Sequence, residues 1–490
     1  MRKINEPQMT LGQKPIDKIV IDMKSRDEIP QLLLGIQRIY SNKEIRNKVE
    51  IVLQEMLPDG VDSKNGRPGM NLWNIFIIGS IRLNCNYDYD HLHDIVNNHK
   101  TIRQFLGHGL FDNEKKYSLQ SLKDNVKLLT PEILEKINTI VVNEGHDLMC
   151  EEDCVLKGRC DSFVLETNVH FPTDSNLLFD AIRKIIQTLA VICEIVGINS
   201  WEQHKFYLRS FKKLFKKVSN MKRSNSKNTE TRKKRDELIK KTYKSLIEDA
   251  LFYVNKAIAT IDNLPSNNQV YFAKIEEAKR YIAHALRQID QIERRVINEE
   301  TIPHKEKVFS IFETHTEWIS KGKAGVPQEL GLRVCILEDN FGFILHNRVM
   351  ENETDDKIAV TMVDDTQAKF PNLRICSFDK GFYTPENKKN LKTKLDMLVM
   401  PKKGRLNKEE IMEESEEAFV QNRRKHSAVE SGINALENHG LNRCPDHGID
   451  GFKRYVALSV VARNLQKLGS YIQKLELEKI RRQQLIKKAA

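Results

Sequence analysis

The feature that most constrains the fold is a stretch of 130 residues, 173–302, that contains one glycine, Gly197, and one proline, Pro265. Because glycine and proline are the residues that most often interrupt regular structure, their scarcity predicts long helices. Two apolar runs in this stretch recur at alternating spacings of three and four, as in the seams of coiled coils. These runs are Tyr243, Ile247, Ala250, Val254, Ala257 and Ile261, and then Ile275, Ala278, Ile282, Ala285, Ile289, Ile292 and Val296. The short turn at 264–268 predicts an antiparallel coiled-coil hairpin, and the same seams are equally compatible with contact to another subunit.

Positive charge is concentrated in the same stretch. The chain has 490 residues, with 79 Lys and Arg against 68 Asp and Glu, so its formal net charge is +11. Residues 205–244 alone hold 16 Lys and Arg against Glu230, Asp236 and Glu237, which gives +13 in 40 residues and leaves the rest near −2. Such a segment is either a solvated helix face or a surface that binds a polyanion. The candidate DNA-binding residues here are Lys212, Lys213, Lys216, Lys217, Lys222, Arg223, Arg232, Lys233, Lys234 and Arg235.

Composition excludes several classes of protein. With 30% charged residues and a mean hydropathy of −0.51, the chain does not read as an integral membrane protein. No apolar segment follows Met1-Arg2-Lys3, so a secretory signal is not expected and we predict a cytoplasmic location. The spacing of Cys150, Cys154 and Cys160 fits neither paired zinc knuckles nor a secreted disulfide framework, which favours reduced thiols.

Outside the helical stretch, the pattern changes along the chain. Residues 1–145 read as mostly helical. From about Lys305, strands are expected at 308–319, 330–336, 343–349, 373–378 and 398–400, with a hairpin turn at 340–342. Thr384 and Pro385 suit the start of a helix, and a further helix is expected from Lys408 to about His439. This order predicts a mixed α/β sheet with covering helices.

Three carboxylates occupy positions where a metal site could form. Asp161 begins a segment of β-branched and aromatic residues, which predicts a strand, and Asp379 follows the end of another strand. Val429, Ile433 and Leu436 form the buried stripe of a helix. Glu430 comes one residue after Val429, so it is placed at the border of this stripe. Oxygen ligands of this kind suit Mg²⁺ or Mn²⁺, and two such ions could activate a nucleophile and stabilise a leaving oxygen at a phosphodiester. Taken singly, each acid is more simply a surface residue.

The segments around these acids resemble the catalytic blocks of bacterial insertion-sequence transposases of the DDE class. The first-aspartate block is CDSFVLETNVHFPTDS at 160–175, the second is SFDKGFYTPEN at 377–387, and the glutamate helix is HSAVESGIN at 426–434. RCP at 443–445, GFKRYV at 451–456 and ARNL at 462–465 resemble the tail that follows, and GRP at 66–68 matches an N-terminal segment. The resemblance implies an RNase H-like catalytic core in which Asp161, Asp379 and Glu430 hold two Mg²⁺ or Mn²⁺ ions.

The glutamate helix departs from the pattern of many relatives, which is Tyr-x2-Arg-x3-Glu-x6-Lys. The matching positions are Arg423, His426, Glu430 and Glu437, so only the glutamate is retained. Arg424, Lys425 and His426 are therefore the candidates for contact with DNA phosphates. About 130 helical residues also stand between the first strand and the next strands, which places the basic segment inside the nuclease fold as an insertion.

Together these features predict a DNA transposase that cuts the ends of an insertion sequence and joins the 3′-OH ends to target DNA. Its partners would be double-stranded DNA, at element ends and target, and a second copy in synapsis, and it would act in the bacterial cytoplasm at the nucleoid. The expected parts are a helical N-terminal domain that binds DNA (1–145), the catalytic core (146–176 and 304–470), the basic insertion (177–303) and a charged helical tail (471–490). Two alternatives are an inactive DNA-binding relative and an RNase H-like nuclease that hydrolyses without strand transfer.

Overall fold

The computed structural model describes residues 3–4, 12–57, 69–109, 111–112, 114–150, 154–221, 229–265, 269–320 and 328–489. The GRP segment at 66–68, Lys222 and Arg223 lie outside these residues. The chain divides into two compact units, of which unit 1 comprises residues 1–168 and 319–490 and unit 2 comprises 169–318. Within the described part of the chain, no helix has both the length and the apolar character needed to cross a bilayer.

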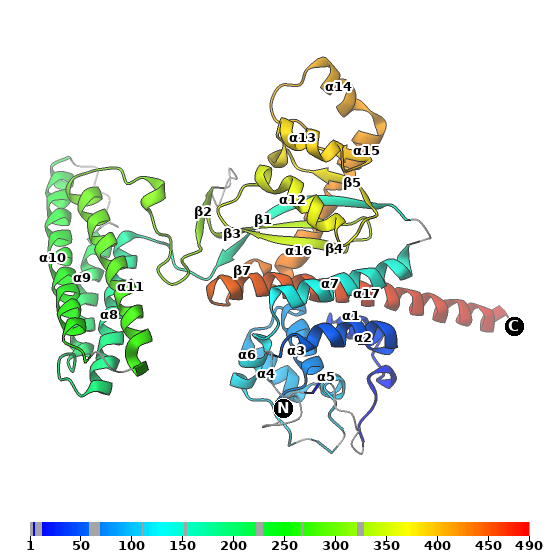
Figure 1. Cartoon of the computed structure of the whole chain (residues 1–490), viewed down its shortest axis with the longest axis horizontal. Helices are drawn as coiled ribbons and strands as arrows, with labels where there is room; N and C mark the ends of the chain where they lie inside the picture. Colours follow the sequence, from blue (N-terminus) through cyan, green and yellow to red (C-terminus); the bar gives the residue numbers. More distant parts are fainter. Residues whose placement is uncertain are drawn as a thin grey trace. The chain divides into compact units, whose positions relative to one another are not determined.

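Unit 1 is built on a mixed sheet with the order β2-β3-β1-β5-β6, in which β4 also pairs with β3 and β7 with β1 (Figure 1). The α/β class predicted from the sequence is therefore confirmed. Strand β3 is antiparallel to β1 and β4 is antiparallel to β3, whereas β5 is parallel to β1 and β6 is parallel to β5. The strands are β1 (Leu156–Thr167), β2 (Glu317–Ser320), β3 (Gln328–Glu338), β4 (Ile344–Met350), β5 (Leu373–Phe378), β6 (Met397–Val399) and β7 (Arg443–Cys444).

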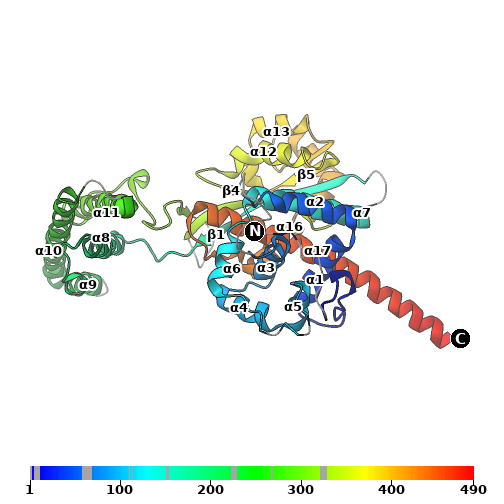
Figure 2. The ribbon, with the colours of Figure 1, turned by 60° about the horizontal axis from the view of Figure 1, so that its bottom comes forward.

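The helices of unit 1 surround this sheet (Figures 1 and 2). Before the sheet come α1 (Ile29–Ser41), α2 (Lys43–Gln54), α3 (Leu72–Asn84), α4 (Tyr89–Asn98), α5 (Lys100–Phe105), α6 (Leu119–Val126) and α7 (Pro131–Met149). Between and after its strands come α12 (Asp355–Gln367), α13 (Pro385–Lys392), α14 (Lys408–Ser415), α15 (Glu417–His426), α16 (Ala428–Leu436) and α17 (Gly448–Ala489). Short 3₁₀ or π turns lie at Ile16–Lys18, Lys380–Phe382 and Glu437–Leu441.

One hydrophobic core joins residues 1–145 to the sheet. It runs from Ile16 in the N-terminal region through β1, β3 and β5 to Leu468 on α17. Helix α17 packs on α1, α7 and α3, and its closest approach to α1 is at Gly35 and Gly469. A Cβ added to Gly35 would lie 2.1 Å from the carbonyl oxygen of Leu465, so only glycine permits this backbone contact. The N-terminal helices and the sheet thus form one folded unit.

Unit 2 is a helical bundle (Figure 1). Its helices are α8 (Asp174–Val196), α9 (His204–Met221), α10 (Thr229–Asp262) and α11 (Gln269–Ile292), which is followed by a π turn at Glu293–Ile297 and a 3₁₀ turn at His304–Glu306. The long helices predicted from the scarcity of glycine and proline are present. Both predicted seams contribute to one core, in which Tyr243, Ala250, Ala278 and Ala285 are buried.

The seams do not form an isolated two-helix coiled coil. Helix α11 packs most extensively on α8, and α10 contacts α8, α9 and α11. The apolar residues of α8, Leu178, Ile182, Ile185 and Leu189, provide this additional surface and are buried in the same core. A seam repeated every three and four residues fixes which helix face is buried but not which helix covers it, so the hairpin prediction was incomplete.

Two further predictions differ from the structure. The strand expected at 308–319 is reduced to Glu317–Ser320. The hydroxyl of Ser310 accepts hydrogen bonds from the backbone N–H groups of Phe312 and Glu313, and such local bonds compete with a strand ladder. The helix expected from Lys408 to His439 is divided into α14, α15 and α16, because Glu416 has extended backbone angles (φ −58°, ψ 136°) and a second break lies at Ser427.

Candidate active site

Asp161 lies on β1, the central strand of the sheet. Its Oδ1 accepts the backbone N–H of Ser162 at 2.7 Å. Burial is the largest cause that raises the pKa of Asp161, and the negative charges of Asp379, Asp355 and Glu430 add to it, so that the pKa is about 6 although the Ser162 N–H lowers it. A carboxyl group that responds to three other carboxylates lies in a cluster of like charge. The pKa shift is therefore also evidence that these side chains are close together.

The register of the sheet explains why Asp379 lies near Asp161. Cys160 pairs with Phe378 across the parallel strands β1 and β5, so the next residue of each strand is one of the two aspartates. Asp379 is exposed and precedes the Lys380–Phe382 turn, in which Phe382 is buried. Thr384 then caps α13 by accepting the N–H of Asn387 at 3.0 Å, and Pro385 is the first helical residue, as predicted. The buried turn and the capped helix together fix the backbone on which Asp379 is carried.

Glu430 reaches the cluster from α16, which contacts β1. Val429, Ile433 and Leu436 are buried, whereas Glu430 is exposed. The glutamate therefore lies at the edge of the buried face, where the sequence pattern had placed it.

A fourth carboxylate, Asp355, was missed by the sequence interpretation. It is the first residue of α12, and its Oδ1 accepts a hydrogen bond from the hydroxyl of Ser162 at 2.7 Å. Ser162 therefore connects two acids, since its N–H binds Asp161 and its hydroxyl binds Asp355. The available signal was the pair Asp355-Asp356 directly after the hairpin strand, but acids in the first turn of a helix are common for electrostatic reasons alone.

The chemistry of this donor set fits a hard divalent cation. All four side chains offer carboxylate oxygens, and their mutual repulsion is what a bound cation would relieve. Among the described residues, no group of three or more His, Cys, Asp or Glu side chains is arranged so that it could hold a metal ion. The hydrogen bonds to Ser162 hold one oxygen each of Asp161 and Asp355. Asp161, Asp379 and Glu430 are the residues that would hold Mg²⁺ or Mn²⁺, with Asp355 beside them.

The three basic candidates near Glu430 occupy different surroundings on α15. Arg424 is exposed. Lys425 lines a pocket between α15 and the strands β1 and β5. His426 is mostly covered, and its Nδ1 lies 2.9 Å from the hydroxyl of Ser377 on β5. Burial lowers the pKa of His426, while nearby Asp379 raises it. His426 is therefore a mostly buried neighbour of the carboxylates. Lys425, the residue before it, is exposed.

The basic residues of unit 2 form an exposed surface on α9 and the start of α10. Phe211 and Val218 of α9 are buried, and Phe215 stacks on Phe179 of α8 with ring centroids 4.8 Å apart. The opposite face of α9 is therefore solvated. The exposed cations on the two helices are Lys212, Lys213, Lys216, Lys217, Arg232, Lys233 and Lys234. Arg235 differs from them, because its Nε and Nη1 are buried and its side chain is only 24% exposed.

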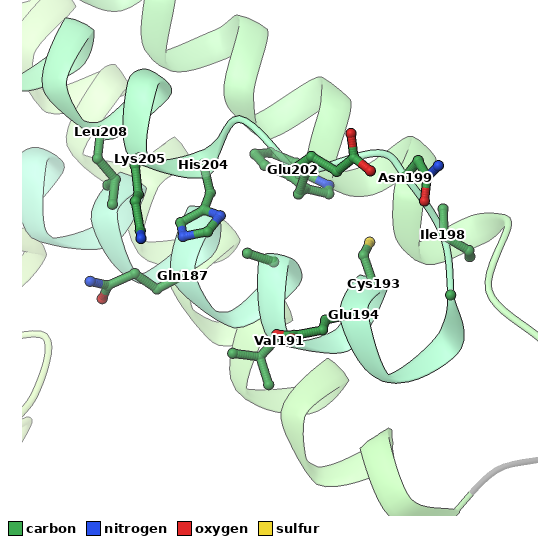
Figure 3. Close-up of a pocket in the computed structure, with 13 residues that line it drawn as sticks. Gln187, Val191, Cys193, Glu194, Ile198, Asn199, Glu202, His204, Lys205 and Leu208 are labelled. Atoms are coloured by element: carbon green, nitrogen blue, oxygen red, sulfur yellow. The ribbon is translucent and has the colours of Figure 1, made fainter.

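A larger pocket, of about 730 Å³, lies in unit 2 between the end of α8 and the start of α9 (Figure 3). Cys193, Glu194 and Lys205 point toward this space, and Trp201 is among the residues that line it. The indole N–H of Trp201 donates to Thr260 at 3.0 Å, and the ammonium of Lys256 lies 4.7 Å from its ring. Burial raises the pKa of the Cys193 thiol, so this cysteine is not an activated nucleophile. The pocket lies in unit 2, whereas the carboxylate cluster lies in unit 1.

No match was found when the chain was compared with protein-family models, with curated proteins and with solved structures. The functional argument therefore depends on the residues of the chain itself.

Proposed function

We propose that this protein is a DDE-type transposase, which cleaves the ends of an insertion sequence and joins the freed 3′-OH ends to target DNA. The observation that carries the proposal is the carboxylate cluster. Asp161, Asp379 and Glu430 are separated by more than 200 residues of sequence in total, yet the charges of Asp379 and Glu430 act on Asp161 and raise its pKa. The catalytic blocks that resemble this transposase class contain these same three acids.

The sheet supports an RNase H-like core. A strand order of β4-β3-β1-β5-β6, with the first three strands antiparallel and the last two parallel to β1, is the order expected for that fold. It also brings one aspartate from the central strand next to one from the adjacent parallel strand. Fold and function remain separate inferences, because many activities share one architecture.

The chain's own residues would have distinct roles in this reaction. Asp161 and Asp379 follow the paired residues Cys160 and Phe378 and supply two carboxylates, and Glu430 adds the third from α16. Two Mg²⁺ ions bound there would supply activation of water or of a 3′-OH on one side of the phosphodiester and stabilisation of the leaving oxygen on the other. Ser162 orients Asp161 and Asp355 through its two hydrogen bonds. The exposed cations of α9 and α10 would attract the DNA backbone. Two copies of the protein would bring the two element ends together.

The test is a cleavage and strand-transfer assay. A supercoiled plasmid carrying the DNA that flanks the coding region on both sides is incubated with the protein and Mg²⁺. We expect metal-dependent nicking at those ends and covalent joining to target DNA. Asp379→Asn and Asp161→Asn should each reduce cleavage by about 10²–10³-fold or more, since each removes charge from the group that stabilises the transition state.

Asp90→Asn is the matched control, because Asp90 is an exposed acid in the first turn of α4. It should leave both activities unchanged. Cleavage that survives in Asp379→Asn would refute the assignment. Cleavage without any joined product would identify a hydrolytic nuclease, and DNA binding without either product would identify an inactive relative.

A further inference from the structure

A second pocket, of about 300 Å³, lies in unit 1 between the strands β1 and β5 and helix α15. Its volume is at the lower end of the range for small-ligand sites. Its lining is polar and carries three cations and no carboxylate. The residues used below are Lys157, Arg159, Asn340, Ser377, Asn422 and Lys425.

This pocket is on the same face of the sheet as the candidate catalytic aspartates. Side chains alternate between the two faces of a strand, so Arg159 shares a face with Asp161 two residues further along β1. Ser377 likewise precedes Asp379 by two residues on β5, which is paired with β1 in parallel register. Two residues of a strand span about 6–7 Å. The pocket and the carboxylates are therefore successive sites along the same two strands.

The pocket has a fixed positive charge. Nη1 of Arg159 donates to Oε1 of Glu338 at 3.2 Å and also lies 3.4 Å from the carbonyl oxygen of Asp339, which holds the guanidinium in place. Burial raises the pKa of Glu338 to about 7, so this acid offsets Arg159 only in part near neutral pH. Lys157 and Lys425 are exposed. The described side chains that line the pocket thus leave it net positive beside an acidic cluster.

Two amide side chains add hydrogen-bonding capacity. Oδ1 of Asn340 accepts the backbone N–H of Lys157 at 3.0 Å, so the NH₂ group of this exposed residue is the part that remains to donate to a ligand. Asn422 reaches the pocket from α15, and its Nδ2 donates to the carbonyl oxygen of Ala418 at 2.9 Å. Its Oδ1 is an acceptor. Cations for a phosphate and amides for a base edge or sugar are the groups that nucleotide recognition requires.

We infer that this pocket binds one nucleotide of the DNA strand that enters the carboxylate cluster, with its phosphate on Lys157, Arg159 and Lys425. The inference rests on the proposed function, and it adds the contact that sets the strand's position. Arg159 and Asp161 are separated along β1 by about 6–7 Å, a step of the same order as that between neighbouring phosphates on one strand. A continuous strand can therefore occupy both sites at once, whereas a free mononucleotide fills only one.

The test compares Lys157→Gln/Lys425→Gln with the control Lys474→Gln/Lys479→Gln, whose lysines are exposed on α17 in unit 1. Arg159 is left intact, because its removal would leave Glu338 buried without its partner. Binding of a 20-base-pair duplex from the flanking DNA is measured by fluorescence anisotropy over a range of salt concentrations. Since both lysines serve one phosphate, and Arg159 remains there partly offset by Glu338, the slope of log K against log salt should fall in magnitude by up to about 0.9 in the test variant. Both variants should keep the wild-type melting temperature.

Three outcomes would overturn the inference. They are an unchanged slope in the test variant, an equal fall in the control, and a fall of about 1.8, which would mean two independent surface contacts. Cleavage by the wild-type protein is scored in parallel. A slope change without cleavage would keep the pocket and refute the transposase, and cleavage without a slope change would do the reverse.

Discussion

The two units of this protein handle charge in opposite ways. In unit 1, acids are gathered in the sheet and partly removed from water, so the pKa values of Asp161 and Glu338 are raised to about 6 and about 7. In unit 2, the apolar faces of α8, α10 and α11 close on one another and the lysines of α9 remain in solvent. Under the proposed function the difference would separate two tasks, because a surface that attracts DNA needs solvated cations and a site that holds metal ions needs clustered carboxylates.

The units also differ in how their contacts arise. The helices of unit 2 depend on patterns repeated every three or four residues, which are local in sequence. The sheet of unit 1 pairs β1 with β3 and β5, strands that are separated from it by more than 150 residues. Each prediction below tests one side of this contrast.

The largest expected effect concerns the basic surface. Replacing Lys212, Lys213, Lys216 and Lys217 by glutamine should lower the magnitude of the salt slope of DNA binding by about 3–4, because each lysine that neutralises one phosphate contributes about 0.9. Affinity at low salt should fall by about 10²-fold or more. Fluorescence anisotropy with the flanking duplex measures both. A control with Lys403, Lys408, Lys474 and Lys479 replaced keeps the same net charge, and all four are exposed in unit 1. An equal loss in both proteins would mean that net charge, and not this helix face, attracts DNA.

This contrast also explains what the sequence could predict. The long helices, the seam residues and the apolar face of α9 could all be predicted, because each depends on neighbours within a few turns. The helix that covers each seam could not be predicted. Helix α11 packs on α8, and the pattern of α8 does not specify which helix pairs with it. In unit 1 the positions of individual strands along the sequence were predicted well, as with β3 and β5. The division of the long helix after Lys408 was not, because Glu416 is unremarkable as a residue type and is extended only in its tertiary setting.

The next effect concerns backbone packing. Gly35→Ala should destabilise unit 1 by about 2–3 kcal/mol, because the added Cβ would meet the backbone of Leu465 on α17 and a backbone cannot move aside as a side chain can. Gly197→Ala in unit 2 should cost only about 1 kcal/mol, since Gly197 ends α8 at φ +77° and an added Cβ would have nothing within 4 Å. Hydrogen exchange read by mass spectrometry assigns each loss to its unit. Equal protection of α1 and α17 in wild type and Gly35→Ala would contradict the close contact.

The candidate site shows where local patterns stop being informative. Asp161, Asp379 and Glu430 were selected through a resemblance in their flanking residues, and nothing in their spacing placed them together. The pairing of Cys160 with Phe378 accomplishes that, and pairing register is a property of the folded sheet. Asp355 was missed for the same reason. Its interaction with Ser162 joins residues 193 positions apart, and no local pattern distinguishes it from Asp356.

The smallest effect tests the charge cluster without any DNA. The pKa of Asp161 is raised in the folded protein from 3.8 to about 6, so the folded state holds a proton that the unfolded state has lost between these values. Stability should therefore fall as pH rises through this window and stay lower above it.

Asp161→Asn removes the ionisation and should be more stable than wild type by about 1–2 kcal/mol at pH 7.5. This is below the ~3 kcal/mol that the full shift implies, because exposed neighbours are screened by solvent. The two proteins should converge near pH 4. Thermal unfolding at both pH values measures the difference, with Asp90→Asn as the control. Adding Mg²⁺ at pH 7.5 should raise the melting temperature of wild type and of Asp90→Asn but not of Asp161→Asn, since a cation relieves repulsion only where the carboxylates remain. A stability difference that does not depend on pH would show that the pKa of Asp161 is not raised in the folded protein.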